Sequence, residues 1–384
     1  MVAQKSDKFF LFTVDVEDWF QVENFKASIP FDTWDDRELR VEQNTHKLLD
    51  LLGDEKGEGS RIPGFRGSSE TNKTTNQLNQ QTNNGNQNSE FRSQNSVDRG
   101  QECAAESMEV PNSLSRISCS SRGWAQPTTH NPQHSTHTNV RATFFVLGWV
   151  AKKLPGLIRE IHQRGHEVAS HGNNHHLCTT ESAGLLQKDL AGSKALLEDI
   201  IGSRVVGYRA PSFSINDDVL KVIEDAGYQY DASFNSFDKH GRYGRISTNG
   251  FRKTGIAYQI SESFYEIPIS NLCLQPSTFS LLRSSFNRKP FVLPLGGGGY
   301  FRLFPYMLFK KGIRRILQED NAYSFYLHPW EVDPGQPRVK NAPASLKFRH
   351  YINLASNENK VRRMLADFRD CRFVTCREYL DSLS

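Results

Sequence analysis

The sequence has no CxxC pair and little net charge. Its six cysteines are scattered along the chain (Cys103, Cys119, Cys178, Cys273, Cys371 and Cys376). This distribution argues against a disulfide framework and against a zinc site built from thiolates. The formal net charge is +4 over 384 residues. Such a small value gives no reason to expect a nucleic acid or an anionic membrane as a partner.

Long apolar runs are also missing. No stretch reaches the roughly 18 apolar residues that a membrane-spanning helix needs. The first residues carry Lys5 and Lys8, but only six apolar or neutral residues separate Lys8 from Asp15. That run is too short for the core of a signal peptide. We therefore expect a soluble, cytoplasmic protein without a transmembrane segment.

Hydrophobic residues make up only 37% of the chain, and the shortage has a local cause. Of the thirty residues 71–100, twenty are Asn, Gln, Ser or Thr. Such a segment buries too little apolar surface to offset the entropy lost on ordering, so we expect it to be disordered. We interpret residues 53–139 as a low-complexity insertion within a single domain, 1–384. An inert insertion is the simpler interpretation, and a tail that binds a partner is the alternative.

Outside the insertion, buried-strand patterns alternate with amphipathic helical patterns. Apolar runs typical of strands occupy 9–14, 142–147, 166–171, 205–211, 228–233, 265–270, 323–328 and 372–376. Helical spacing is found at 44–52, 150–165, 182–202, 215–227, 305–317 and 357–368. This alternation predicts an α/β fold with a parallel sheet of seven or eight strands. A (β/α) barrel or a close variant is the leading architecture.

Ionisable side chains recur where the predicted strands end. In barrels of this kind the active site lies at the C-terminal ends of the strands. His171 and His175 lie four residues apart, a spacing that can present two imidazoles to one metal ion. Two histidines and one carboxylate form a common catalytic zinc set, whereas His166, at a strand start, is expected to be structural. The residues at the strand ends are Asp15, Glu17, Asp18, His171, His175, Arg209, Asp231 and His328.

Four motifs in this order resemble those of a known family, the NodB-type polysaccharide deacetylases of carbohydrate esterase family 4. They are "TVDVED", "SHGNNH", "RAPSF" and "LHPWEVDP". The stretches "ATFFVLGWVA", "GYRAPSFSI" and "GGGGYFR" are similar to a branch associated with bacterial exopolysaccharide export systems. The resemblance covers nearly the whole chain outside the insertion and implies a distorted (β/α) barrel of seven or eight strands.

The resemblance implies a role for each motif residue. Asp15 matches the catalytic base of the family, and Arg209 matches the arginine that pairs with this base. His171 and His175 match the histidines that bind the metal ion. His328 matches the catalytic acid. The implied cofactor is a divalent metal ion, and zinc is the expected one.

Two positions depart from the family pattern. Val16 stands where the family has a second aspartate, so Glu17 or Asp18 must supply the third metal ligand. Alternation along an extended strand places Glu17 on the side of Asp15, which favours Glu17. Asp231 matches the aspartate that orients the catalytic acid, although the tryptophan expected after it is absent.

The substrate-binding residues implied by the resemblance are Pro211, Phe213 and Trp330. A backbone amide near Phe213 is expected to hold the oxyanion of the reaction. Trp330 is expected to wall the sugar site, and core packing is the alternative reading of this side chain.

The expected function is metal-dependent hydrolysis of N-acetyl groups from hexosamines of a bacterial polysaccharide, either an exopolysaccharide or its precursor. The expected partners are an N-acetylated glycan and an exopolysaccharide synthesis or export machinery. One alternative is a related amide hydrolase that acts on a small ureide or cyclic amide. Another is a glycan-binding relative without activity, which would not need both Asp15 and His328.

Overall fold

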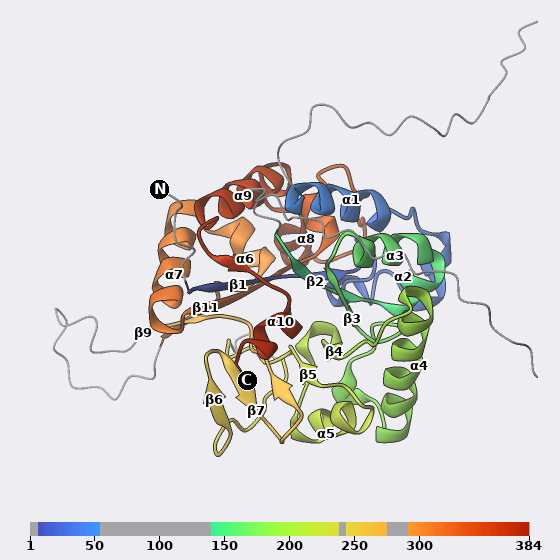
Figure 1. Ribbon diagram of the computed structural model, residues 1–384. Helices are drawn as coiled ribbons and strands as arrows, with labels where there is room; N and C mark the ends of the chain where they lie inside the picture. Colours follow the sequence, from blue (N-terminus) through green and yellow to red (C-terminus); the bar gives the residue numbers. More distant parts are fainter. Residues whose placement is uncertain (1–6, 54–139, 238–242, 275–290, 384) are drawn as a thin grey trace, which may run out of the picture. The chain divides into compact units, whose positions relative to one another are not determined.

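The computed structural model describes residues 7–53, 140–237, 243–274 and 291–383 (Figure 1). The predicted insertion, 53–139, lies outside the described residues from residue 54 onward. In the described residues, no helix is both long enough and apolar enough to cross a membrane.

One mixed sheet organises the fold. Its core is a run of seven parallel strands, in the order β11 (Ala322–Leu327), β1 (Phe9–Val16), β2 (Ala142–Val146), β3 (Glu167–Ser170), β4 (Gly207–Tyr208), β5 (Tyr230–Asp231) and β8 (Tyr265–Glu266). Two antiparallel strands extend it beyond β8, namely β7 (Ala257–Gln259) and β6 (Arg252–Thr254). A short strand, β12 (Arg372–Phe373), also pairs with β1. A separate antiparallel pair consists of β9 (Leu272–Leu274) and β10 (Phe291–Leu293).

The run of parallel strands curls into a half-barrel, and hydrogen bonds link the segment after β8 to β11. Ser270, after β8, donates its N–H to the carbonyl of Ser324 in β11 at 3.2 Å. The N–H of Ser324 donates in return to Ser270 Oγ at 2.9 Å. A further bond runs from Tyr326 N to Gly296 O at 2.8 Å. The predicted distorted (β/α) barrel is confirmed.

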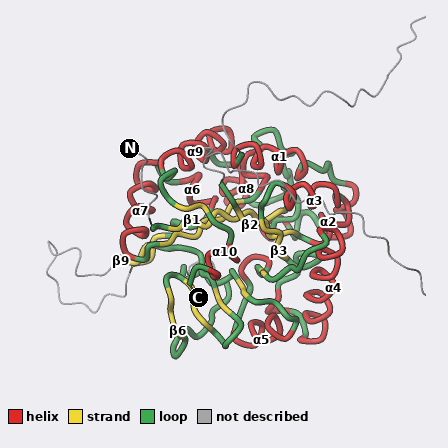
Figure 2. The backbone as a smooth tube through the Cα atoms, in the orientation of Figure 1, coloured by secondary structure: helices red, strands yellow, loops and turns green. Residues whose placement is uncertain are grey.

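Helices lie outside the strands (Figure 2). They are α1 (Val41–Leu52), α2 (Gly148–Lys153), α3 (Pro155–Gln163), α4 (Ala183–Ile201), α5 (Asp217–Asp225), α6 (Gly298–Leu303), α7 (Tyr306–Glu319), α8 (Ala344–Tyr351), α9 (Leu354–Asp367) and α10 (Cys376–Asp381). Short 3₁₀ turns follow several strands, among them η4 (Pro211–Phe213) and η7 (Pro329–Val332).

The helix predicted over 150–165 is two helices. α2 ends at Lys153 and α3 begins at Pro155, and Leu154 between them is non-helical, with φ −131° and ψ 56°. Proline has no N–H to donate and disfavours helical geometry in the residue before it, so the ring ends one helix and starts the next.

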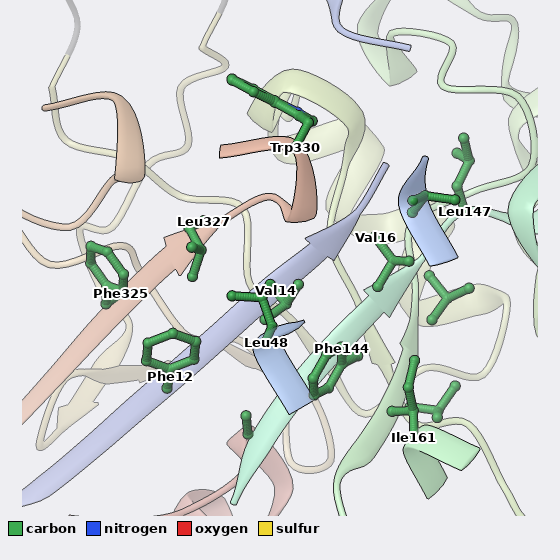
Figure 3. Close-up of a cluster of buried hydrophobic side chains, with 14 of the residues drawn as sticks. Phe12, Val14, Val16, Leu48, Phe144, Leu147, Ile161, Phe325, Leu327 and Trp330 are labelled. Atoms are coloured by element: carbon green, nitrogen blue, oxygen red, sulfur yellow. The ribbon is translucent and has the colours of Figure 1, made fainter. Parts of the chain in front are cut away.

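Strand β1 is buried on both faces, which explains why its sequence reads as a continuous apolar run. Phe12, Val14 and Val16 pack toward the helices, together with Phe144 and other side chains (Figure 3). Fully burying a side chain of this size contributes about 1.5–3 kcal/mol to stability. Leu11, on the other face, packs in a second cluster inside the curled sheet. Because side chains alternate along a strand, Asp15 shares this inner face.

Candidate active site

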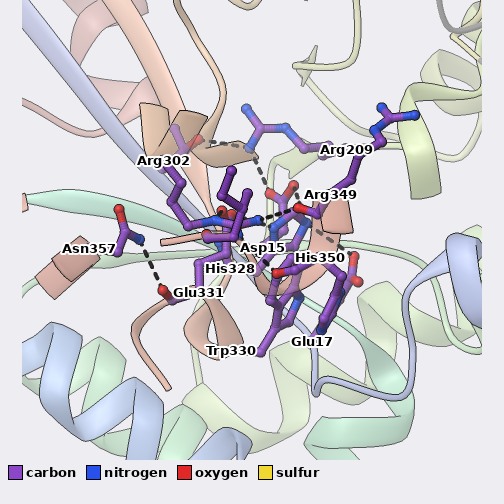
Figure 4. Close-up of polar contacts among 12 residues, drawn as sticks. Asp15, Glu17, Arg209, Arg302, His328, Trp330, Glu331, Arg349, His350 and Asn357 are labelled. Carbon is purple, nitrogen blue, oxygen red and sulfur yellow. Dashed lines mark hydrogen bonds and ion pairs between the residues drawn. The ribbon is translucent and has the colours of Figure 1, made fainter. Parts of the chain in front are cut away.

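A pocket opens where the parallel strands end. The carboxylates of Asp15 and Glu17, at the end of β1, line it with His171, His175 and His328. These five residues come from three segments that are far apart in the sequence, and all of them are buried or nearly so. The structure therefore brings together most of the ionisable residues that the strand ends predicted (Figure 4).

Glu17 lies at the centre of a potential metal site. Its Oε1 lies 2.9 Å from His171 Nε2 and 3.0 Å from His175 Nε2, and all three side chains are buried. One ligand atom from each residue lies within 4.8 Å of the other two. Burial opposes ionisation of Glu17, but the surrounding histidines outweigh it and hold the pKa of this carboxyl well below its usual value.

The hydrogen bond behind His171 decides what its other nitrogen can do. His171 Nδ1 lies 2.7 Å from the carbonyl oxygen of Arg209. A carbonyl only accepts, so Nδ1 carries a proton, and in the neutral ring Nε2 carries a lone pair. That lone pair points at Glu17 Oε1, which is also an acceptor. A cation between them would satisfy both atoms, and a carbonyl partner is typical of histidines that bind metals.

His175 reaches the same carboxylate through an unusual backbone. Its φ is 57°, in the left-handed region that residues other than glycine rarely adopt. Ser212 and Phe213, in the turn after β4, have φ values of 52° and 58°. All three residues line the pocket. Strained conformations of this kind cluster at functional sites.

Asp15 is held by a buried arginine. Arg209 Nη1 donates to Asp15 Oδ1 and to Thr13 Oγ1, each at 2.7 Å, and its Nε donates to the carbonyl of Ala232 at 2.8 Å. The guanidinium lies 4.0 Å from the centre of the Phe145 ring. These contacts leave Asp15 Oδ2 directed toward His328, with Nε2 of that histidine 3.9 Å away.

Asp18 does not join the metal cluster, although it follows Glu17 directly. Its Oδ2 accepts the N–H groups of Arg40 at 2.6 Å and Val41 at 2.8 Å, where α1 begins, and its Oδ1 accepts the N–H of Trp19 at 2.8 Å. Burial raises the pKa of Asp18 to about 6, against the effect of these three donors. The carboxylate therefore caps α1. This geometry disagrees with the expectation that Asp18 could be the third metal ligand.

Asp231 is also placed differently from the expectation. Its carboxylate accepts the N–H and the hydroxyl of Ser233 at 3.1 and 2.7 Å. It forms a buried pair with Glu266, and burial raises the pKa of both carboxyls. The predicted role of Asp231 as the orienter of His328 needs correction, because another carboxylate occupies that place.

Glu331 is the residue that the sequence reasoning missed. Its Oε1 lies 2.9 Å from His328 Nδ1, and His328 N donates to the same oxygen at 3.1 Å. Burial lowers the pKa of His328, but the charges of Glu17 and Glu331 outweigh it and raise the value to about 9. The available signal was the spacing, because a carboxylate three residues after a turn-starting residue is a capping-box pattern.

The predicted substrate-binding residues divide into two groups. Phe213 and Trp330 line the pocket, whereas Pro211 is buried beneath it. Trp330 is only 6% exposed and also packs against the core, so its role at a sugar site stays a prediction. Phe213 N donates to Ala210 O at 2.9 Å. Ser212, in the same turn, also lines the pocket.

Two parts of the chain match models of known protein families. The family model described as "Polysaccharide deacetylase" matches residues 124–230, and a model described as a domain of unknown function (DUF3473) matches residues 232–381. Residues 124–230 are therefore similar to polysaccharide deacetylases, and each of the two matches covers less than half of the chain. Enzymes of this family are hydrolases that act on carbon–nitrogen amide bonds.

Two relatives of this chain have names that describe deacetylases. A peptidoglycan-N-acetylglucosamine deacetylase of Bacillus cereus is 31% identical over 124 residues, covering 32% of this chain and 57% of that protein. A chitooligosaccharide deacetylase of Sinorhizobium fredii is 37% identical over 89 residues, covering 23% and 41%. The chain thus spans about half the length of these relatives. A crystal structure of a Mycobacterium smegmatis protein is 16% identical, with a TM-score of 0.49, covering 100% of this chain and 92% of that one.

Proposed function

We propose that this protein hydrolyses N-acetyl groups from hexosamines of a bacterial polysaccharide, with an exopolysaccharide or its precursor as the substrate. The proposed cofactor is a divalent metal ion, with zinc as the first candidate. One observation carries the proposal. A buried set of two histidines and a carboxylate lies in the same pocket as an arginine-held carboxylate and a histidine, which together form an acid–base pair.

The donor set fits a divalent cation. Glu17, His171 and His175 would hold it, with an imidazole and carboxylate composition that suits zinc. Such a cation supplies Lewis acidity to the acetyl carbonyl and to the attacking water. The other steps belong to the side chains around it.

Asp15 acts as the general base. It takes a proton from the water as the water oxygen bonds to the acetyl carbon. Arg209 donates to Asp15 Oδ1 and orients the carboxylate, so that Oδ2 is left to receive the proton. The oxyanion that forms on the former carbonyl oxygen accepts a hydrogen bond from the Ser212 N–H.

His328 acts as the general acid. Its Nε2–H donates a proton to the amide nitrogen as the carbon–nitrogen bond breaks, and the products are acetate and a free amine. His328 Nε2 lies 3.9 Å from Asp15 Oδ2, so the proposed acid and base share one pocket. The Glu331 carboxylate behind Nδ1 favours the protonated imidazole that this step needs.

Acetate release tests the proposal. Purified protein is incubated with an N-acetylglucosamine oligomer as isolated, after treatment with a chelator, and after zinc is restored. We expect release that is lost on chelation and recovered with zinc. Release that is undiminished without metal would contradict the metal role. Absence of release from every N-acetylated glycan, with turnover of a ureide or cyclic amide, would support the alternative hydrolase.

A further inference from the structure

We propose that Glu331, fixed by Arg302, is the positioning residue that aims His328 at the leaving amine. This inference rests on the proposed function, because it concerns the acid of that reaction. Glu331 touches neither the reacting atoms nor the cluster around Glu17, so it acts through His328.

Glu331 holds both the side chain and the backbone of His328. The carboxylate is fully buried, and its Oε1 accepts from His328 Nδ1 at 2.9 Å and from His328 N at 3.1 Å. A carboxylate behind Nδ1 fixes the proton on that nitrogen. It also turns Nε2 toward the pocket, where it lies 3.9 Å from both Asp15 Oδ2 and Glu17 Oε1.

Arg302 holds the other oxygen of the same carboxylate. Its Nε donates to Glu331 Oε2 at 2.7 Å, and both side chains are buried (Figure 4). Arg302 Nη1 donates to the carbonyls of His350 at 2.9 Å and Ile352 at 2.8 Å, at the end of α8. The guanidinium is therefore anchored at its far end, and the carboxylate has one orientation that satisfies every donor.

The glycine run before Arg302 makes room for this carboxylate. A Cβ atom on Gly298 would overlap the Glu331 side chain and lie 2.6 Å from Oε2. Gly298 begins α6, and Arg302 lies on the next turn of the same helix. The motifs "GGGGYFR" and "HPWE" thus form one structural unit. The missing side chain of Gly298 leaves space for the Glu331 carboxylate, whose two oxygens accept from Arg302 and His328.

A stack of rings limits the remaining freedom of His328. The Trp330 ring lies at 5.1 Å and 21° from the His328 ring, and at 4.1 Å and 15° from the His350 ring on its other side. Ring stacking restricts tilt, while the hydrogen bond to Glu331 restricts rotation. Together they hold Nε2–H at one place in the pocket, as an oriented proton donor requires.

Glu331→Gln tests the role of this carboxylate in positioning His328, with little change in side-chain shape. An amide has one acceptor and one donor, so it cannot accept from both Arg302 and His328, and one of the two hydrogen bonds must fail. We measure kcat and KM for acetate release from an N-acetylglucosamine oligomer. In parallel we measure hydrolysis of an aryl acetate, whose leaving group needs no proton.

We expect kcat on the amide to fall about 10- to 100-fold with little change in KM, as is typical when an outer partner of an active-site histidine is lost. Hydrolysis of the aryl acetate should change less than about threefold, because only the acid step is affected. Equal losses on both substrates, or no loss on either, would overturn the inference. If the wild-type protein hydrolyses neither substrate, the proposed function fails as well.

The matched control is Asp333→Asn, which breaks another buried ion pair in the same segment. Asp333 Oδ2 accepts from Arg40 Nε at 2.6 Å and from Asn44 Nδ2 at 3.0 Å. This variant should lower stability without separating amide from ester turnover. The NMR signal of the His328 Nδ1–H gives a readout independent of turnover. We expect this signal in the wild type and in Asp333→Asn, and its shift or loss in Glu331→Gln; an unchanged signal would contradict the inference.

Discussion

The two ends of strand β3 carry histidines in opposite settings. His166, before the strand, receives the N–H of Ala142 on its Nδ1 at 3.3 Å. Its ring packs near Phe144, with 5.1 Å between ring centres, and burial together with the nearby Arg164 charge lowers its pKa to about 4. His171, after the strand, has the carbonyl of Arg209 behind its Nδ1 at 2.7 Å.

The difference shows that the atom facing Nδ1 determines which nitrogen of the neutral ring keeps a lone pair. A backbone N–H behind His166 makes Nδ1 an acceptor, so in the neutral ring the proton lies on Nε2, which cannot bind a metal ion. A carbonyl behind His171 makes Nδ1 the donor and leaves the Nε2 lone pair for the pocket. His328 belongs with His171, because an acceptor, the Glu331 carboxylate, lies behind its ring.

The largest expected effect is at the base. Asp15→Asn should lower kcat for acetate release by about 10²- to 10⁴-fold, because an amide cannot take the proton of the attacking water. Zinc content should stay near that of the wild type, since Asp15 lies outside the Glu17, His171 and His175 set. Acetate assays and metal analysis on the same preparations check both points, and undiminished turnover would remove Asp15 from the base role.

The next largest effect is on zinc affinity, and it distinguishes the adjacent carboxylates of Glu17 and Asp18. Glu17→Gln should weaken zinc affinity by at least about 100-fold, more than the loss expected for an outer partner. Asp18→Asn should leave zinc affinity near the wild-type value, because its oxygens serve the start of α1. Competition with a fluorescent zinc chelator measures both variants. The opposite ranking would return the ligand role to Asp18.

A smaller effect concerns pH and the structural histidine. Below pH 6.5 the unfolded chain protonates His166, whereas the folded chain does so only near pH 4. The unfolded state thus binds more protons between these values, so stability falls as pH drops through this window, by up to about 3 kcal/mol from this group. His166→Asn keeps an acceptor for Ala142 N and should show a shallower dependence in urea unfolding from pH 4 to 6.5. An equal slope would contradict the setting described for His166.

The smallest effect is on stability alone. Asp18→Asn replaces one carboxylate oxygen by a donor, so part of its bonding to the three backbone N–H groups is lost. The cost should be about 1–3 kcal/mol. Urea unfolding at pH 7.5 measures it, with the exposed Asp32→Asn as a control that should change little. A neutral Asp18→Asn would show that the start of α1 is satisfied without this carboxylate.

Much of the fold could be predicted because its signals are local. Apolar runs and helical spacing located β1, β2, β3 and β11 and the longer helices. The side chain of Asn216 accepts from Val219 N at 2.8 Å, and asparagine is a residue that helix starts favour. Pro155 is itself a signal for a break between two helices. The apolar spacing continues on both sides of it, so the prediction gave one helix. The β6–β7 hairpin is short and largely polar, so it gave no strand pattern.

The site was less predictable where it depends on distant contacts. Strand ends predicted Asp15, His171, His175 and His328, since a barrel brings such ends together. Alternation favoured Glu17, and the structure places its carboxylate beside both histidines, although the chain already turns there, with Glu17 N donating to Asp15 O at 2.9 Å. Glu331 owes its fixed orientation to its ion pair with Arg302, 29 positions away, whereas the sequence showed only its spacing of three residues from His328.

Zinc titration of the metal-stripped protein tests most directly whether Glu17, His171 and His175 form a metal site. Calorimetry at pH 7.5 compares the wild type with His171→Asn and His166→Asn, the two ends of the same strand. We expect one zinc ion per chain for the wild type and for His166→Asn, and affinity weakened by at least about 100-fold for His171→Asn. Zinc binding that is unchanged in His171→Asn, or absent from the wild type, would contradict the assignment.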